Sequence, residues 1–197
     1  MAKQTLNFVL VGVGGQGTIL ASDVLAELGL KLGYDVKKAE VHGMSQRGGS
    51  VVSHLRWGPQ VFAPVIARGE ADFLVAFEKL EAARFVELLR PGGTVLVNDY
   101  AITPATVNAG SAVYPPDDVL QAALAAANVR AVWVKGAEIA ESLGNARVAN
   151  VVLLGALSAL LELAPEAWNE VLALRVPAKL LELNRKAFQA GRSAALN

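Results

Sequence analysis

Cysteine is absent from all 197 residues of this sequence. The chain therefore cannot form disulfides, and it cannot hold zinc or an iron–sulfur cluster through thiolates. A Gly-Lys-Ser/Thr phosphate loop and a paired-histidine metal motif are missing as well, and the two histidines, His42 and His54, stand far apart. We find no set of residues that would form a self-sufficient catalytic centre.

Charged residues and long apolar runs are also scarce. Charged residues make up 18% of the chain and hydrophobic residues 53%, against typical shares of roughly 25% and 45–50%. We interpret this excess as apolar surface that another chain covers. Lysine plus arginine equals aspartate plus glutamate at 18 each, so no basic surplus argues for nucleic acid.

The longest uncharged apolar stretch, 148–161, is shorter than the ~20 residues that span a bilayer. The N-terminus enters a strand-like run without a cleavable signal. We therefore expect a soluble, cytoplasmic protein that contacts no membrane.

Strand-like and helical patterns alternate along residues 1–135. Strands are expected at 6–11, 34–41, 50–57, 73–77, 94–98 and 130–134, and helices at 18–32, 79–89 and 115–127. This alternation predicts an α/β fold with three layers, in which a mainly parallel, Rossmann-like sheet carries helices on both faces.

The remaining residues, 136–197, have helical patterns only. Asn145 is expected to cap a helix that runs to Leu163, and this helix should be central because it is apolar nearly all round. Pro177 is expected to open the last helix and Gly191 to end it. No linker is recognisable, so residues 1–197 are predicted to form a single domain, with an α/β core at 1–135 and C-terminal helices at 136–197.

Two glycine-rich segments bury too little apolar area for core packing to explain them. The first is formed by Gly12, Gly14, Gly15, Gln16 and Gly17, between a strand and a helix. Its spacing is that of a dinucleotide fingerprint, and Glu40 at the end of the second strand could serve as the ribose-binding acid. The alternative is a tight strand-to-helix turn, or a ligand other than a nicotinamide nucleotide.

The second segment combines glycines with one fixed positive charge, and it consists of His42, Gly43, Met44, Ser45, Gln46, Arg47, Gly48 and Gly49. Arg47 could clamp a phosphate or carboxylate, or it could pair with an aspartate and fix the loop. His42 could titrate near neutrality, but a lone histidine is more often structural. His54 is interpreted as a residue on one face of a strand.

Polar residues also gather at the start of the apolar helix. Asn145, Arg147 and Asn150 form this cluster, and an arginine in a first turn opposes the helix dipole. A compensating anion is therefore needed, either from this chain or from a partner or ligand. Three acids near another helix start, Asp72, Glu78 and Glu81, are interpreted as structural.

The order of the two glycine-rich segments, followed by a strand, resembles the small (beta) subunits of indolepyruvate:ferredoxin oxidoreductases. More broadly, it resembles the gamma subunits and domains of 2-oxoacid:ferredoxin oxidoreductases. The segment 42–49 is the specific part of this resemblance. It continues through 69–72, 77–82, 114–115, 144–150 and 184–188, and so covers nearly the whole chain.

The resemblance implies one subunit of a heteromeric enzyme that converts indolepyruvate and other arylpyruvates to arylacetyl-CoA and reduces ferredoxin. The large (alpha) subunit would carry thiamine diphosphate, magnesium and the iron–sulfur clusters, and coenzyme A would be a co-substrate. The absence of cysteine here, and of a Gly-Asp-Gly magnesium motif, agrees with that division.

The implied role of this chain is to shape the active-site cleft, with both glycine-rich segments facing it and Arg47 as the expected ligand contact. Two other hypotheses remain open at this stage. One is a stand-alone NAD(P)-binding oxidoreductase, and the other is a non-catalytic assembly subunit.

Overall fold

The computed structural model describes residues 4–42 and 48–196. The strands are β1 (Leu6–Val13), β2 (Asp35–His42), β3 (Ser50–Gly58), β4 (Ala71–Ala76), β5 (Leu89–Asn98) and β6 (Arg130–Val134). The helices are α1 (Thr18–Lys31), α2 (Lys79–Phe85), α3 (Ala105–Asn108), α4 (Asp117–Ala126), α5 (Gly136–Ser142), α6 (Ala149–Leu160), α7 (Pro165–Arg175) and α8 (Leu181–Leu196), with short 3₁₀ turns η1 (Val86–Leu88), η2 (Ala146–Val148) and η3 (Ala178–Leu180).

The strands form one sheet in the order β2-β3-β1-β4-β5-β6. The pairs β1–β4, β4–β5 and β5–β6 are parallel. Strand β3 pairs antiparallel with both β1 and β2. Five strands therefore point the same way and β3 alone is reversed. The predicted mainly parallel sheet is confirmed.

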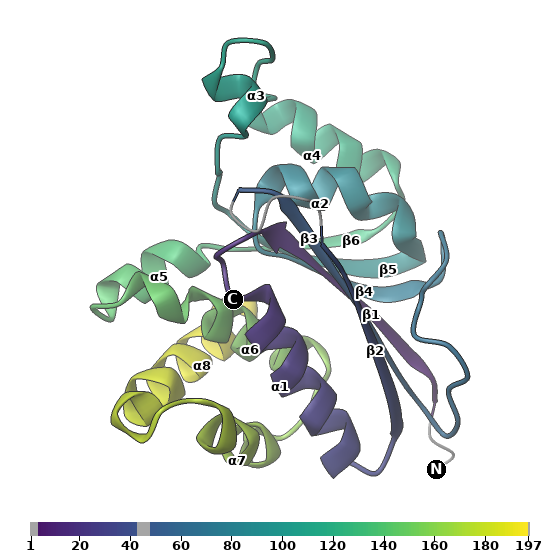
Figure 1. The fold of residues 1–197 in the computed structure, drawn as a ribbon, viewed down its shortest axis with the longest axis vertical. Helices are drawn as coiled ribbons and strands as arrows, with labels where there is room; N and C mark the ends of the chain where they lie inside the picture. The colour runs from purple at the N-terminus through teal and green to yellow at the C-terminus, as the bar shows by residue number, and fades with distance from the viewer. Residues whose placement is uncertain (1–3, 43–47, 197) are drawn as a thin grey trace.

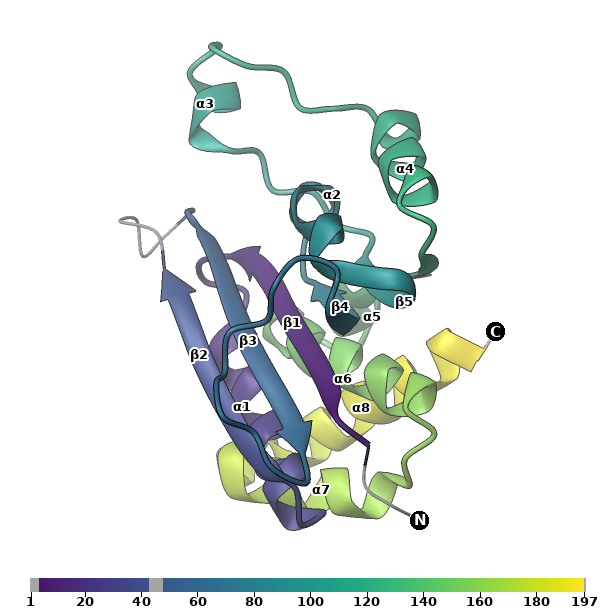
Figure 2. The ribbon, with the colours of Figure 1, turned by 90° about the vertical axis from the view of Figure 1, so that its right-hand side faces the viewer.

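Helices cover the sheet on both faces, as predicted (Figures 1 and 2). On one face lie α1 and the C-terminal helices, packed on Phe8 and Leu10 of β1. On the other face, α2 and α4 pack over the β4–β6 half, and Val9 and Val11 belong to this second core. Because successive residues of β1 serve opposite cores, β1 is buried on both sides and anchors all three layers.

The apolar helix α6 is central, as its composition predicts. All residues from Asn150 to Ala159 are buried, and α8 is packed along it. The prediction that Gly191 ends the last helix is wrong, because α8 continues to Leu196. A Cβ atom at Gly191 would lie 1.8 Å from the carbonyl oxygen of Val152, so this glycine lets two helix backbones approach closely.

Two other predicted helices also have different bounds in the structure. The helix expected at 79–89 ends at Phe85, because Leu89 is buried and pairs with Ala71 as the start of β5. Asn145 caps the 3₁₀ turn η2 and not α6 itself, and α6 ends at Leu160, three residues before the predicted end.

His54 lies in the middle of β3 and is buried. Its Nδ1 accepts a hydrogen bond from the backbone N–H of Ile66 at 3.3 Å, in the segment that follows β3. Burial, together with the nearby positive charge of Arg56, lowers the pKa of His54 below its usual value. The imidazole is therefore neutral at neutral pH and serves the fold, which agrees with its interpretation as a residue on one face of a strand.

Across the two stretches of chain that the structure describes, none of the helices combines the length and the apolar composition needed to cross a membrane.

Candidate active-site pocket

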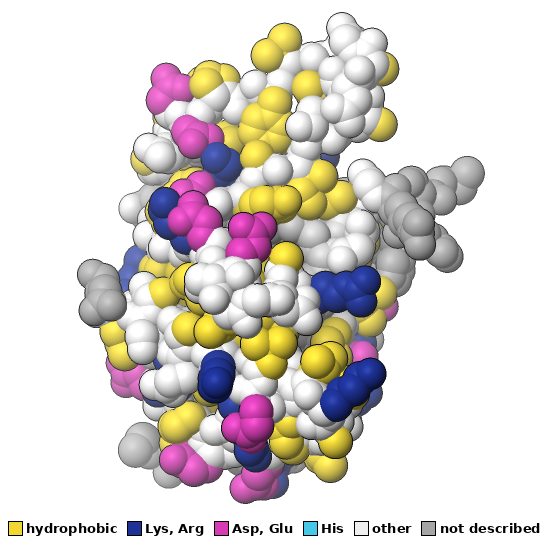
Figure 3. Space-filling view, turned by 90° about the vertical axis from the view of Figure 1, so that its left-hand side faces the viewer, with side chains coloured by type: hydrophobic (Ala, Val, Ile, Leu, Met, Phe, Trp, Pro, Cys, Tyr) yellow, Lys and Arg dark blue, Asp and Glu magenta, His cyan; other side chains and the backbone are white. Residues whose placement is uncertain are grey.

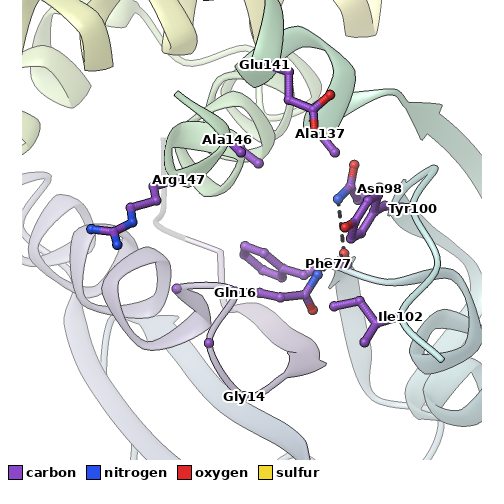
Figure 4. Close-up of a pocket in the computed structure, with 13 residues that line it drawn as sticks. Gly14, Gln16, Phe77, Asn98, Tyr100, Ile102, Ala137, Glu141, Ala146 and Arg147 are labelled. Atoms are coloured by element: carbon purple, nitrogen blue, oxygen red, sulfur yellow. Dashed lines mark hydrogen bonds between the residues drawn. The ribbon is translucent and has the colours of Figure 1, made fainter. Parts of the chain in front are cut away.

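A pocket of about 660 Å³ opens at the carboxyl edge of the parallel strands (Figure 4). This edge, between β1 and β4, is where helix α1 leaves to one face and α2 to the other. Open α/β sheets bind ligands at such a switch point because the chain diverges there and leaves a crevice. The lining residues are Gly14, Gly15, Gln16, Gly17, Phe77, Asn98, Tyr100, Ile102, Ala137, Glu141, Ala146, Arg147 and Ala149.

Four residues of the first glycine-rich segment line this pocket, namely Gly14, Gly15, Gln16 and Gly17. Gly15 and Gly17 have φ of 106° and 78°, a left-handed conformation that other residues rarely adopt. A Cβ atom at Gly12 would come within 2.9 Å of Phe77 Cβ, so this glycine allows the turn to pack on the next strand. Gly17 then forms the N-cap of α1, which places the positive end of the helix dipole beside the pocket.

The amide side chains of Gln16 and Asn98 hydrogen-bond to backbone groups that border the pocket. Gln16 accepts a hydrogen bond from the N–H of Val13 at 2.8 Å and donates one to the carbonyl oxygen of Phe77 at 2.7 Å. Asn98 donates to the same carbonyl at 3.1 Å. Gln16 therefore lines the pocket but uses its amide to tie the β1 loop to the end of β4. Asn98 Oδ1 is buried and has no hydrogen-bond partner within the described chain.

The structure brings the second predicted cluster to the same place. Asn150 donates a hydrogen bond to the carbonyl oxygen of Gly17 at 3.4 Å, which joins α6 to the glycine loop. Asn145 accepts a hydrogen bond from the N–H of Arg147 at 3.0 Å and so caps η2. Both asparagines therefore hold the backbone, while Arg147 remains available to a ligand.

Arg147 lines the pocket on the side opposite Asn98 and Tyr100, and its guanidinium points away from them (Figure 4). The residue is exposed, and no carboxylate of residues 4–42 or 48–196 forms an ion pair with it. The anion that the sequence predicts for this arginine is therefore not supplied by the described part of the chain. The other charged side chain in the lining is Glu141, on α5.

The second glycine-rich segment falls largely outside the described residues. This applies to Gly43, Met44, Ser45, Gln46, Arg47 and the side chain of His42. Its two described ends lie near the first segment, because β3 pairs with β1 and Gly14 donates a hydrogen bond to the carbonyl oxygen of Gly49 at 2.9 Å. The structure thus brings the start and end of this loop to the edge of the sheet where the pocket lies.

Glu40 does not occupy the position of a ribose-binding acid. Strand β3 lies between β1 and β2, so Glu40 on β2 is two strand spacings, about 10 Å, from the glycine loop strand. Its carboxylate also accepts hydrogen bonds from Lys38 at 2.7 Å and from Ser22 at 3.4 Å. This arrangement does not favour the NAD(P) hypothesis.

The three acids near α2 are structural, as predicted. Asp72 accepts hydrogen bonds from the N–H of Asn7 at 2.8 Å and from Arg90 at 2.7 Å. Glu81 is buried and pairs with Arg84 at 2.8 Å. Glu78 caps α2 by accepting from the N–H of Glu81 at 2.9 Å.

Eight of the thirteen residues that line the pocket were not predicted from the sequence. Phe77 follows β4, Asn98 and Tyr100 lie at and after the end of β5, and Ala137 follows β6. These residues could have been found from the sequence, because each lies at or after the carboxyl end of a predicted parallel strand and these ends share one edge of the sheet.

Comparisons with known proteins agree with this architecture. Residues 7–194 match the family model described as pyruvate ferredoxin/flavodoxin oxidoreductase. The "Indolepyruvate oxidoreductase subunit IorB" of Pyrococcus horikoshii is 39% identical over 192 residues, which are 96% of this chain and 95% of that protein.

Two solved structures have the same fold. The keto/oxoacid ferredoxin oxidoreductase gamma subunit of Geobacter sulfurreducens superposes with a TM-score of 0.72 at 28% identity, covering 97% of this chain and 98% of that one. The 2-oxoglutarate:ferredoxin oxidoreductase of Magnetococcus marinus superposes with a TM-score of 0.76 at 22% identity, covering 98% of this chain and 31% of that one. A six-stranded sheet with this pocket edge, together with a family match over residues 7–194, shows that the chain belongs to the pyruvate ferredoxin/flavodoxin oxidoreductase family.

Proposed function

We propose that this chain is the small subunit of an indolepyruvate oxidoreductase. The observation that carries the proposal is the 39% identity to an indolepyruvate oxidoreductase subunit over nearly the full length of both chains. The reaction is the oxidative decarboxylation of indolepyruvate and other arylpyruvates to arylacetyl-CoA, with ferredoxin as the electron acceptor. We place this complex in the cytoplasm.

The hard chemistry is proposed to belong to the large subunit. Thiamine diphosphate with magnesium supplies the carbanion chemistry and iron–sulfur clusters carry single electrons. The donor set of this chain does not fit those groups, because it has no cysteine, and no group of three or more His, Asp or Glu residues gathers in the described part. We propose that the residues of this chain instead bind and orient the ligand and exclude water from the site.

The pocket is the proposed point of contact with the reaction. Gly14–Gly17 line the pocket beside the start of α1, where the positive end of the helix dipole favours an anion. Arg147 adds a positive charge without a described internal partner. We also propose that the segment 42–49, with Arg47 as the ligand contact, faces the same site, because its described ends lie at this edge of the sheet. An anionic group of coenzyme A or of the 2-oxoacid is the ligand we assign to this site.

The isolated chain should not bind NAD or NADP. Glu40 is engaged with Lys38 and Ser22, and an intervening strand keeps it away from the glycine loop. Isothermal titration calorimetry with each nucleotide should therefore show no saturable heat. Micromolar binding of either would revive the stand-alone dehydrogenase hypothesis.

Activity should require the large subunit. We expect no turnover of indolepyruvate by the purified small subunit, and coenzyme-A-dependent ferredoxin reduction once the large subunit is added. The control is the large subunit alone. If the large subunit alone is as active as the mixture, this chain is not a functional subunit of that enzyme.

A further inference from the structure

A segment between β5 and α4 projects from the body of the protein. It contains the single helical turn of α3 and rises well above the three layers in two perpendicular views (Figures 1 and 2). We call residues 103–113 the arm. None of its residues is buried, and Val113 is 88% exposed. The arm therefore contributes nothing to either core.

The arm and its flanks carry no charge. Residues 100–116 read Tyr-Ala-Ile-Thr-Pro-Ala-Thr-Val-Asn-Ala-Gly-Ser-Ala-Val-Tyr-Pro-Pro, in a chain that is 18% charged overall. The upper right of Figure 3 accordingly shows hydrophobic and uncharged polar surface without charged side chains.

The start of α2 holds both ends of the arm. The carboxylate of Glu78, 1% exposed, accepts hydrogen bonds from the N–H of Ile102 at 3.1 Å and from the hydroxyl of Tyr114. Lys79 pairs with Asp117 at 2.7 Å and with Asp99 at 3.5 Å. Residues just before the arm and just after it therefore converge on the same two side chains, which we call the neck.

The hydrogen bond from Tyr114 to Glu78 is available at neutral pH. Burial, followed by the adjacent Glu78 carboxylate, raises the pKa of Tyr114, so the phenol keeps the proton that it donates. Pro104, Pro115 and Pro116 further restrict the backbone where the arm leaves and returns. A surface loop whose ends meet in this way is an Ω-loop, and such loops are frequently functional.

We propose that the arm is the docking element for the large subunit, an inference that rests on the proposed function. The arm continues directly from Tyr100 and Ile102, which line the pocket, so a chain seated on it would also reach the pocket mouth. Because residues 100–116 carry no charge, a charged group buried against the arm would have no counter-ion, and we therefore expect an uncharged partner surface. The contacts of the neck tie down both ends of the arm, which reduces the conformational entropy that the arm can lose on association.

The test compares two exposed apolar residues on different surfaces. Val113→Asp places a carboxylate on the arm, and Leu174→Asp places one on α7, where Leu174 is 79% exposed. Each variant and the unmodified chain are co-expressed with a tagged large subunit, and the affinity of the purified pair is measured by biolayer interferometry. We expect Val113→Asp to weaken the complex at least ~10-fold, a loss of about 1.4 kcal/mol, and Leu174→Asp to leave it unchanged.

A second variant replaces residues 104–112 with two glycines. The neck already brings the flanking residues together, so this variant should keep the thermal stability of the isolated chain while it loses the large subunit. If the unmodified chain does not bind the large subunit, the proposed function fails. If it binds and both arm variants bind equally well, the arm inference alone is overturned. Dissociation of a homodimer of the isolated chain by Val113→Asp, with normal binding of the large subunit, would also overturn it.

Discussion

Gly191→Ala should destabilise the protein by about 2 to 3 kcal/mol. In an ordinary helix interior this substitution stabilises by about 1 kcal/mol, because alanine has the higher helix propensity. Here the added Cβ would lie 1.8 Å from the carbonyl oxygen of Val152, which is backbone and cannot rotate away. Overpacking of this kind costs about 1–3 kcal/mol or more and outweighs the propensity gain. Thermal unfolding of the isolated chain should show a midpoint lower by roughly 4–12 °C.

The facing glycine provides an independent check. A Cβ atom at Gly155 would lie 2.0 Å from the carbonyl oxygen of Phe188, so Gly155→Ala should lower the midpoint in the same way. The matched control is Ser193→Ala, on the exposed side of α8, which should change stability by less than about 0.5 kcal/mol. A higher midpoint for either glycine variant would show that α6 and α8 are not packed this closely.

Arg147→Ala should reduce catalytic efficiency of the assembled enzyme roughly ten- to hundredfold. A charge-assisted contact between a guanidinium and an anionic ligand is worth about 1.5–3 kcal/mol, and the structure gives this arginine no ion-pair partner within the described chain that would compete for it. Arg147→Lys should recover part of the loss, because an ammonium keeps the charge but not the planar fork. Steady-state kinetics and co-purification should be measured on the same preparations.

Two further arginine variants test whether the effect is specific to Arg147. Arg130 is also exposed, but it lies at the amino end of β6, on the opposite edge of the sheet, so Arg130→Ala should leave the kinetics unchanged. Arg47→Ala applies the same assay to the loop 42–49. An intact complex with unchanged kinetics for Arg147→Ala would remove this residue from the site. Release of the large subunit would instead give it a role in assembly.

Local chemistry in the sequence was enough to predict most strands and the first glycine turn. Strand Arg130–Val134 was predicted with its observed bounds, because a short β-branched run has one favourable conformation when both ends are marked by turns. Boundaries that depend on distant contacts were missed. Leu89 reads as the end of a helix, but its pairing with Ala71 in the sheet makes it the start of β5.

Gly191 shows the same limit in another form. A glycine near the end of a helical pattern predicts a helix stop. Only the packing of α8 on α6 shows that this glycine removes a side chain where two backbones meet. Sequence spacing within one helix carries no information about a carbonyl on another.

By itself, the sequence determined the fold class, the absence of thiolate ligands and the presence of two glycine-rich segments. It also led to the prediction that Arg147 needs an anion. Only the tertiary structure decided that Arg147 lies beside Gly17, because α6 packs against the turn after β1. The tertiary structure alone also shows that the reversed strand β3 separates Glu40 from the pocket. It likewise shows the neck at Glu78, from which the arm projects. The physical reason is that periodicity and propensity act over a few residues, whereas sheet order and helix packing join residues far apart in the chain.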